Sequence, residues 1–161
     1  MKRTRAFTLI ELLVVIGIIG VLSAIVLASL AGSRSQGNDT AVKADLATIQ
    51  TQGVLYYGIG NTYGATNPVS TSACMTGGSG AAATVFSDTG SNGLTNTISA
   101  AVASAQKSAN GGAANVYCGS DATWFLAAAK LSNGDFWCVD YTGTSTEKTT
   151  RPAANKKNCS Y

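Results

Sequence analysis

Few side chains in this 161-residue chain are equipped for catalysis. The sequence contains no histidine, which excludes acid–base catalysis by imidazole and triads that contain histidine. Its eight acidic residues are scattered, and neither a GxGxxG nor a Walker phosphate-binding motif occurs. We therefore expect no catalytic residues and no cofactor, and we predict that the protein is not an enzyme.

Cysteines are the remaining groups with a chemistry of their own, and the chain has Cys74, Cys118, Cys138 and Cys159. They form no CxxC pair and no histidine could join them, which disfavours a zinc site. Two disulfides made in an oxidising compartment explain them better. Four cysteines allow three connectivities, and their positions alone leave all three open.

An apolar N-terminal segment would place these cysteines outside the cytoplasm. Residues 12–31 contain no charged side chain, and as a helix they would span ~30 Å, the thickness of a bilayer's hydrocarbon core. Lys2, Arg3 and Arg5 precede this segment. The positive-inside rule then places the N-terminus in the cytoplasm and the rest of the chain outside. Because the excess basic charge lies in this tip, it does not indicate a nucleic-acid-binding face.

A cleaved secretory signal is the first alternative for this segment. Ser29-Leu30-Ala31 could serve as the small-residue cleavage site, which would release a chain that begins at Gly32. The apolar run is longer than the ~7–15 residues of such signals, and the carboxylate of Glu11 stands where the run begins. Both observations favour a membrane anchor.

The residues around Glu11 closely resemble a known family signature. A basic tip, the small residue Ala6 and then the run FTLIELLVVI from Phe7 to Ile16 resemble the N-terminus of type IV prepilins and type II secretion pseudopilins. The resemblance is strong over residues 2–35. It implies a leader of residues 1–6, cleavage between Ala6 and Phe7, and methylation of the new Phe7 amine. This family normally has glycine before the cut, and alanine is the nearest residue in size.

The resemblance also implies how subunits would assemble. Residues 7–31 would form the transmembrane and polymerisation helix. Glu11 of one subunit would neutralise the Phe7 ammonium of its neighbour, because each charge is costly alone in lipid and pairing relieves both. Small residues would help the helices pack: Gly17, Gly20, Ser23 and Ala24. A solvated carboxylate at headgroup depth on a lone anchor is the simpler alternative.

The remaining residues, 32–161, predict a small α+β head. Residues 32–37 read as a flexible break or weak helical turn, with Asn38 or Asp39 as an N-cap. An amphipathic helix from about 39 to 58 follows, with an apolar face formed by Val42, Leu46, Ile49 and Gly53. The resemblance implies that this segment is the upper half of one long helix.

Residues 65–115 are rich in Gly, Ala, Ser and Thr, and we expect irregular loop with one short helix within 93–107. The apolar residues of that window are Leu94, Ile98, Ala101, Val102 and Ala105. Strands are predicted at 123–128 and 135–140, joined at the hairpin signal Asn133-Gly134, with 115–118 beginning the sheet. Together these elements predict a long helix packed on a small antiparallel sheet.

Two site predictions depend on the resemblance. It implies a Cys138–Cys159 bridge that bounds a C-terminal loop, which leaves Cys74 to pair with Cys118. Secretion pseudopilins have a calcium site near their C-terminal end, and Asp135 and Asp140 are weak candidates for one here. Two carboxylates without a defined ligand loop are better interpreted as solvated turn residues, so we predict no metal.

We therefore predict a structural subunit of a type IV pilus or a type II secretion-like pseudopilus. The implied partners are other pilin subunits, a prepilin peptidase, an inner-membrane assembly platform and membrane lipid. The subunit would cross the inner membrane once, with its N-terminus inside, and then enter a periplasmic or extracellular fibre. The alternative is a membrane-tethered or secreted module that binds glycans. Trp124 and Trp137 could contact a sugar in such a module, but they are better interpreted as core residues.

Overall fold

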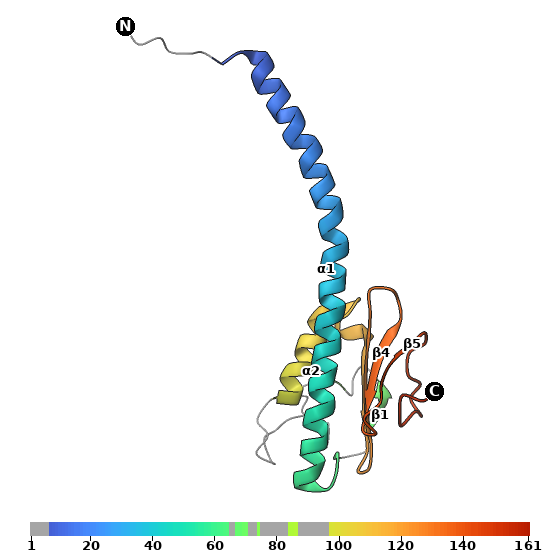
Figure 1. Ribbon diagram of the computed structural model, residues 1–161. Coiled ribbons are helices and arrows are strands. Elements are labelled where there is room, and N and C mark those ends of the chain that lie inside the picture. The colour runs from blue at the N-terminus through green and yellow to red at the C-terminus, as the bar shows by residue number, and fades with distance from the viewer. Residues whose placement is uncertain (1–6, 65–66, 71–73, 75–83, 87–96) are drawn as a thin grey trace. The chain divides into compact units, whose positions relative to one another are not determined.

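The computed structural model describes residues 7–64, 67–70, 74, 84–86 and 97–161 (Figure 1). The chain divides into two compact units, Met1–Gln36 and Gly37–Tyr161, and each is described by itself. Helix α1, Leu9–Gly60, contributes to both units. The first described turns belong to the N-terminal unit, and the sheet belongs to the second.

Helix α1 runs without interruption through the stretch where we expected a break. The prediction of a break at 32–37 was wrong, as was the N-cap at Asn38 or Asp39, because these residues lie inside the helix. Serine hydroxyls in this stretch bond back to helix carbonyls: that of Ser33 donates to Ser29 (3.3 Å) and that of Ser35 to Gly32 (2.8 Å). With the hydroxyls bonded inside the helix, the largest remaining penalty is that of glycine, about 1 kcal/mol for each residue.

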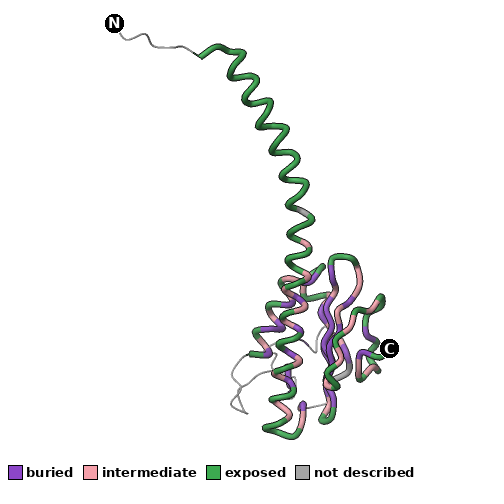
Figure 2. Tube along the Cα trace, viewed as in Figure 1, coloured by how far each residue is buried: buried purple, intermediate pink, exposed green. Residues whose placement is uncertain are grey.

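In the second unit α1 buries one stripe of side chains. Val42, Leu46 and Ile49 are fully buried, while the residues between them are half-buried or exposed (Figure 2). Gly53 continues the stripe, and the ring of Phe125 occupies the space where a side chain would lie. This is the apolar face predicted from the spacing of these residues, and it packs on the sheet core.

The sheet is a five-stranded antiparallel meander. Its strands pair in chain order: β1 (Asn67–Ser70), β2 (Val116–Ser120), β3 (Phe125–Lys130), β4 (Phe136–Asp140) and β5 (Ser145–Lys148). The expected strands lie within two residues of β2, β3 and β4. Gly134 has a φ of 97° in the β3–β4 turn, which explains the glycine after Asn133. The α+β fold predicted from the sequence is confirmed.

Two short helices complete the described part of the second unit. Helix α2 is Thr97–Ser108 and buries the four apolar residues expected of it: Ile98, Ala101, Val102 and Ala105. Leu94, the fifth residue of that expectation, lies outside the described residues. A 3₁₀ helix, η2 (Gly112–Asn115), leads into β2.

The sheet has an apolar cluster on each face. One contains the buried stripe of α1, residues of α2, and the inward side chains Val116, Phe125, Ala127 and Val139. The other, which we call the tail-side face, contains Val69, Trp124, Leu126, Ala128, Cys138 and Cys159, with Tyr161 packed against it. The C-terminal segment therefore covers the face of the sheet opposite α1.

Candidate functional site

The start of α1 is a reciprocally bonded cap formed by Thr8 and Glu11. The Thr8 backbone N–H donates to Glu11 Oε2 (2.9 Å) and the Thr8 hydroxyl donates to the same oxygen (2.8 Å). The Glu11 N–H in turn donates to the Thr8 hydroxyl oxygen (3.3 Å). Thr8 immediately precedes the helix and Glu11 is its third residue, which is the arrangement of a capping box. It gives N–H groups at the helix start partners within the chain.

The sequence contains a local signal for this cap that reasoning from charge alone misses. Thr8-Leu9-Ile10-Glu11 has the T-x-x-E spacing of a capping box before an apolar run. The expectations for Glu11 were a partner on a neighbouring subunit or solvation at headgroup depth, and neither considered a partner within its own chain. The carboxylate has a role within its own chain, and any role between subunits is additional to it.

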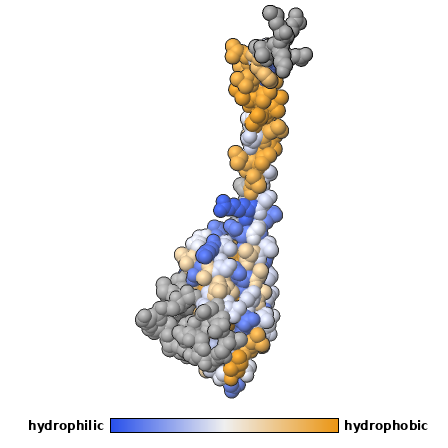
Figure 3. Space-filling view, turned by 90° about the vertical axis from the view of Figure 1, so that its left-hand side faces the viewer, coloured by the Kyte–Doolittle hydropathy of each residue, from blue (hydrophilic) through white to orange (hydrophobic). Residues whose placement is uncertain are grey.

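Around this cap, α1 exposes apolar side chains in every direction. Leu9 is 88 % exposed, and the large aliphatic residues through Leu30 remain about half exposed or more (Figure 3). Phe7 is 82 % exposed and lines a shallow groove of about 370 Å³ with Ile10, Glu11, Val14 and Val15. Nothing lies within 4 Å of where a side chain would be at Gly17 or Gly20.

By length and composition, α1 is the helix in the described residues that could cross a membrane. A signal sequence near an N-terminus would pass the same test. The helix alone therefore does not distinguish a membrane anchor from a cleaved secretory signal. Ala6, the residue before the expected cut, lies outside the described residues.

The structure does not bring the two calcium candidates together. Asp135 precedes β4 and Asp140 ends it, so the two carboxylates lie at opposite ends of the strand. Asp140 is fully buried, and Oδ1 accepts from the Thr142 N–H (2.8 Å) and hydroxyl (2.5 Å), while Oδ2 accepts from the Cys159 N–H (2.7 Å). The two carboxylates therefore do not face a common site, and Asp140 instead anchors the C-terminal loop.

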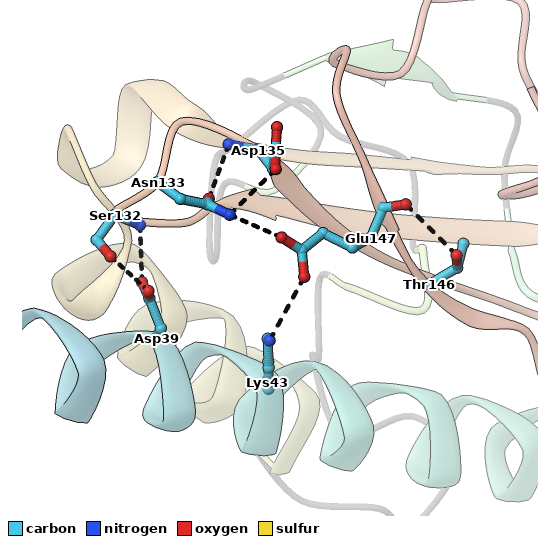
Figure 4. Close-up of polar contacts among 7 residues, drawn as sticks. All are labelled: Asp39, Lys43, Ser132, Asn133, Asp135, Thr146 and Glu147. Atoms are coloured by element: carbon cyan, nitrogen blue, oxygen red, sulfur yellow. Dashed lines mark hydrogen bonds and ion pairs between the residues drawn. The ribbon is translucent and has the colours of Figure 1, made fainter.

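Asp135 belongs to a polar cluster near α1 (Figure 4). The Asn133 Nδ2 donates to Asp135 Oδ2 (3.0 Å) and to Glu147 Oε1 (2.8 Å), and Lys43 pairs with Glu147 at 3.7 Å. Asp39 accepts from the Ser132 N–H (2.8 Å) and hydroxyl (2.5 Å), which ties α1 to the β3–β4 turn. Among the described residues, no group of three or more His, Cys, Asp or Glu is placed to hold a metal.

Both disulfides lie in the C-terminal unit, and each attaches a segment outside the sheet to one of its strands. Cys138 is joined to Cys159 across 21 residues, and Cys74 to Cys118 across 44 residues. This is the connectivity that the resemblance implies. The first bridge attaches the C-terminal segment to β4, and the second attaches Cys74 to β2.

Comparison with known proteins finds similarity at the N-terminus of the chain. Residues 1–27 match the family described as the prokaryotic N-terminal methylation motif. The chain is also similar to the type IV wide pilus major component PilA4 of Thermus thermophilus, with 48 % identity over 46 residues. The N-terminal segment of the chain is therefore similar to that of a type IV pilin. That segment includes the capped, exposed start of α1 described above.

The extent of the match limits what transfers from it. The similarity to PilA4 covers 29 % of this chain and 35 % of that protein's length, so the chain spans about a third of the relative that it matches. No solved structure matches the chain. The similarity therefore concerns the N-terminal segment and does not extend to the head.

Proposed function

We propose that this chain is a structural subunit that polymerises into a type IV pilus or a related pseudopilus through the N-terminal part of α1. The observation that carries the proposal is a pilin-type segment whose large aliphatic side chains are exposed on all sides. Such a surface requires either lipid or neighbouring helices around it. Storage in a membrane before assembly provides the first, and a fibre core provides the second.

Processing would begin at the Ala6–Phe7 bond. Hydrolysis there by a prepilin peptidase would remove the cations Lys2, Arg3 and Arg5 and leave a Phe7 ammonium. The match to the N-terminal methylation motif supports methylation of that amine. Loss of the cytoplasmic cations lowers the barrier to leaving the membrane. An inner-membrane assembly platform is the further partner that this route requires.

The Thr8–Glu11 cap supports a role for Glu11 in subunit pairing. Both Thr8 donors bond to Oε2, which fixes the carboxylate at the first turn and near the chain start. A neighbour's Phe7 ammonium placed against this carboxylate would gain a charge-assisted hydrogen bond in an apolar environment. That pair would fix the axial position of one helix against the next.

The mature N-terminus tests the processing step. We expect mass spectrometry of the chain from its native membrane or fibre to show a methylated Phe7 as the first residue. A chain that begins at Gly32 would identify a secreted protein and overturn the proposal. An uncut Met1 in assembled fibres would equally exclude cleavage as a requirement.

Variants at the cap separate its two roles. We predict that Glu11→Gln inserts into the membrane normally but forms few fibres, because glutamine keeps the capping-box geometry and loses the charge. Thr8→Ala is the matched control, since it keeps the charge and loses the cap at a cost of about 1 kcal/mol in helix stability. Fibre yield measured by shearing and electron microscopy distinguishes them. Equal yields from Glu11→Gln and the unmodified chain would contradict the charge pair.

A further inference from the structure

The tail-side face of the sheet gathers cations at one end. Phe136 on β4 lies opposite Lys130 on β3 and opposite Lys148 on β5. Because side chains alternate along a strand, these three point to the same face as Ala128 and Cys138, which the C-terminal segment covers. Two lysines therefore flank one aromatic ring on the face opposite α1.

A cleft of about 490 Å³ opens on the same side. It lies between β1, the start of β2 and the C-terminal segment, and its walls include Val69, Ala114, Tyr117, Arg151, Pro152 and Ala153. The Val69 N–H donates to the Ala154 carbonyl (3.3 Å), which holds the segment against β1. The cleft therefore has a defined wall on each side.

An aromatic ring and a guanidinium line this cleft. Tyr117 is half-buried, and its ring lies 5.8 Å from that of Phe136 in an edge-to-face contact, which restrains its orientation. Arg151 is exposed, and it belongs to no ion pair among the described residues. The cleft thus combines an ordered aromatic wall with a cation that is open to solvent.

The tail-side face carries an excess of basic side chains. Residues 148–161 contain four basic residues and no acidic one. On the other face, Glu147 pairs with Lys43, and the Asp140 carboxylate, although on the tail-side face, is buried and bonded throughout. Lys157 lies near Asp121 and not in the cleft. The pKa of Asp121 is lowered chiefly by the Thr123 N–H and also by the charge of this lysine.

We propose that this cleft binds an acidic sugar of an anionic polysaccharide, with Arg151 holding the carboxylate and Tyr117 stacking on the apolar face of the ring. A guanidinium matches a carboxylate with two parallel hydrogen bonds. The volume lies within the ~300–1,000 Å³ of ordinary ligand sites. Lys130 and Lys148 supply the positive potential that attracts the neighbouring acidic units of the chain.

The geometry favours a polysaccharide over duplex nucleic acid. A duplex keeps its bases stacked inside and offers phosphates to surface cations, so it would leave the cleft and Tyr117 without a role. A polysaccharide presents whole sugar rings, each with an apolar face and a carboxylate. The sequence favoured a core role for the tryptophans over glycan contact, and Trp124 is indeed buried; the cleft uses Tyr117 instead.

Binding would be measured by calorimetry on the full chain in detergent, with an oligosaccharide of 1,4-linked uronic acid as probe and its uncharged methyl ester as the comparison. We expect the acid form to bind and Arg151→Gln to weaken it about tenfold or more. Ala153→Trp, which fills the cleft from an exposed wall position, should remove binding. Lys107→Gln on α2 carries the same charge change and should leave affinity within about twofold, because it lies outside the cleft.

Three results would overturn the inference. The first is that Lys107→Gln and Arg151→Gln weaken binding of the oligosaccharide equally. The second is that Ala153→Trp binds it as well as the unmodified chain does. The third is that the chain binds duplex DNA more tightly than the uronic acid. Thermal unfolding of each variant checks that the head is folded, and Arg151→Gln still tests the site if Ala153→Trp is not. Since none of these measurements needs a fibre, they do not depend on the proposed function.

Discussion

Helix α1 has two regions with opposite relations to the rest of the chain. From Leu9 to Leu30 its large aliphatic residues are exposed, with Leu22 at 57 %. From Val42 onward one stripe is buried, and Leu46 is fully inaccessible. Both regions are helical and both are rich in apolar residues, so neither property distinguishes them. The two regions differ in how their apolar residues are distributed around the helix. An apolar surface on all sides needs lipid or other helices around it, whereas a single apolar stripe packs on the chain's own sheet.

The largest effect expected from breaking this contrast is at Leu46. We predict that Leu46→Ala lowers the free energy of unfolding of the head by about 2–5 kcal/mol, because it removes buried methyl groups and leaves a cavity. Leu22→Ala makes the same chemical change in the exposed region and should leave that quantity unchanged. Denaturant unfolding of the detergent-solubilised chain, followed by tryptophan fluorescence, measures both. Comparable losses from the two variants would refute the division of α1 into these regions.

A smaller effect is expected where the buried stripe reaches Gly53. A Cβ there would lie 2.7 Å from the Phe125 ring, and Phe125 is itself enclosed by Tyr63 and Phe86. We predict that Gly53→Ala destabilises the head by about 1–3 kcal/mol, although alanine is the better helix former. Gly20→Ala is the matched control, because nothing lies within 4 Å of its Cβ position. A stabilised Gly53→Ala would show that the ring moves aside without loss.

The smallest effect concerns the loop that covers the tail-side face. Burial raises the pKa of Tyr161 to about 12, compared with about 10 for an unperturbed tyrosine. The burial of this neutral phenol stabilises the fold below pH ~10, and that contribution is lost as the pH rises toward 12. Ultraviolet difference titration should show a late-ionising phenol that disappears in Tyr161→Phe. Ionisation of every tyrosine near pH ~10 would contradict it. The head's stability should fall in that pH range while the N-terminal region, which has no tyrosine before Tyr56, stays unaffected.

Local patterns predicted most of the fold because local interactions produce it. The 3–4 spacing of Val42, Leu46 and Ile49 identified the packed face of α1, and Asn133-Gly134 identified the central hairpin. Local reasoning failed at residues 32–39, where a polar, glycine-containing run resembles a loop. This run remains helical because its serine hydroxyls form hydrogen bonds within the helix, and because Asp39 accepts a hydrogen bond from Ser132, which is 93 residues away.

The sites show the same distinction between local and distant information. The Thr8–Glu11 cap could be predicted from four consecutive residues, because both of its partners lie within one helical turn. The burial of Asp140 could not be predicted in this way, because its partner Cys159 is brought to it by the disulfide with Cys138, which is 21 residues away in the sequence. The cleft beside Arg151 depends on strand register and on the path of the C-terminal segment, neither of which is encoded in any short motif.

The meander order of the sheet leaves two edge strands, and each is protected against pairing with another chain. β1 contains Pro68, which has no N–H to donate, and the C-terminal segment bonds to it through Ala154. β5 is four residues long and carries Glu147 and Lys148 in succession. Short, charged or covered edges resist strand addition. Copies of this head at high local concentration are therefore expected to resist joining their sheets edge to edge, which would distinguish any packing between them from an amyloid-like one.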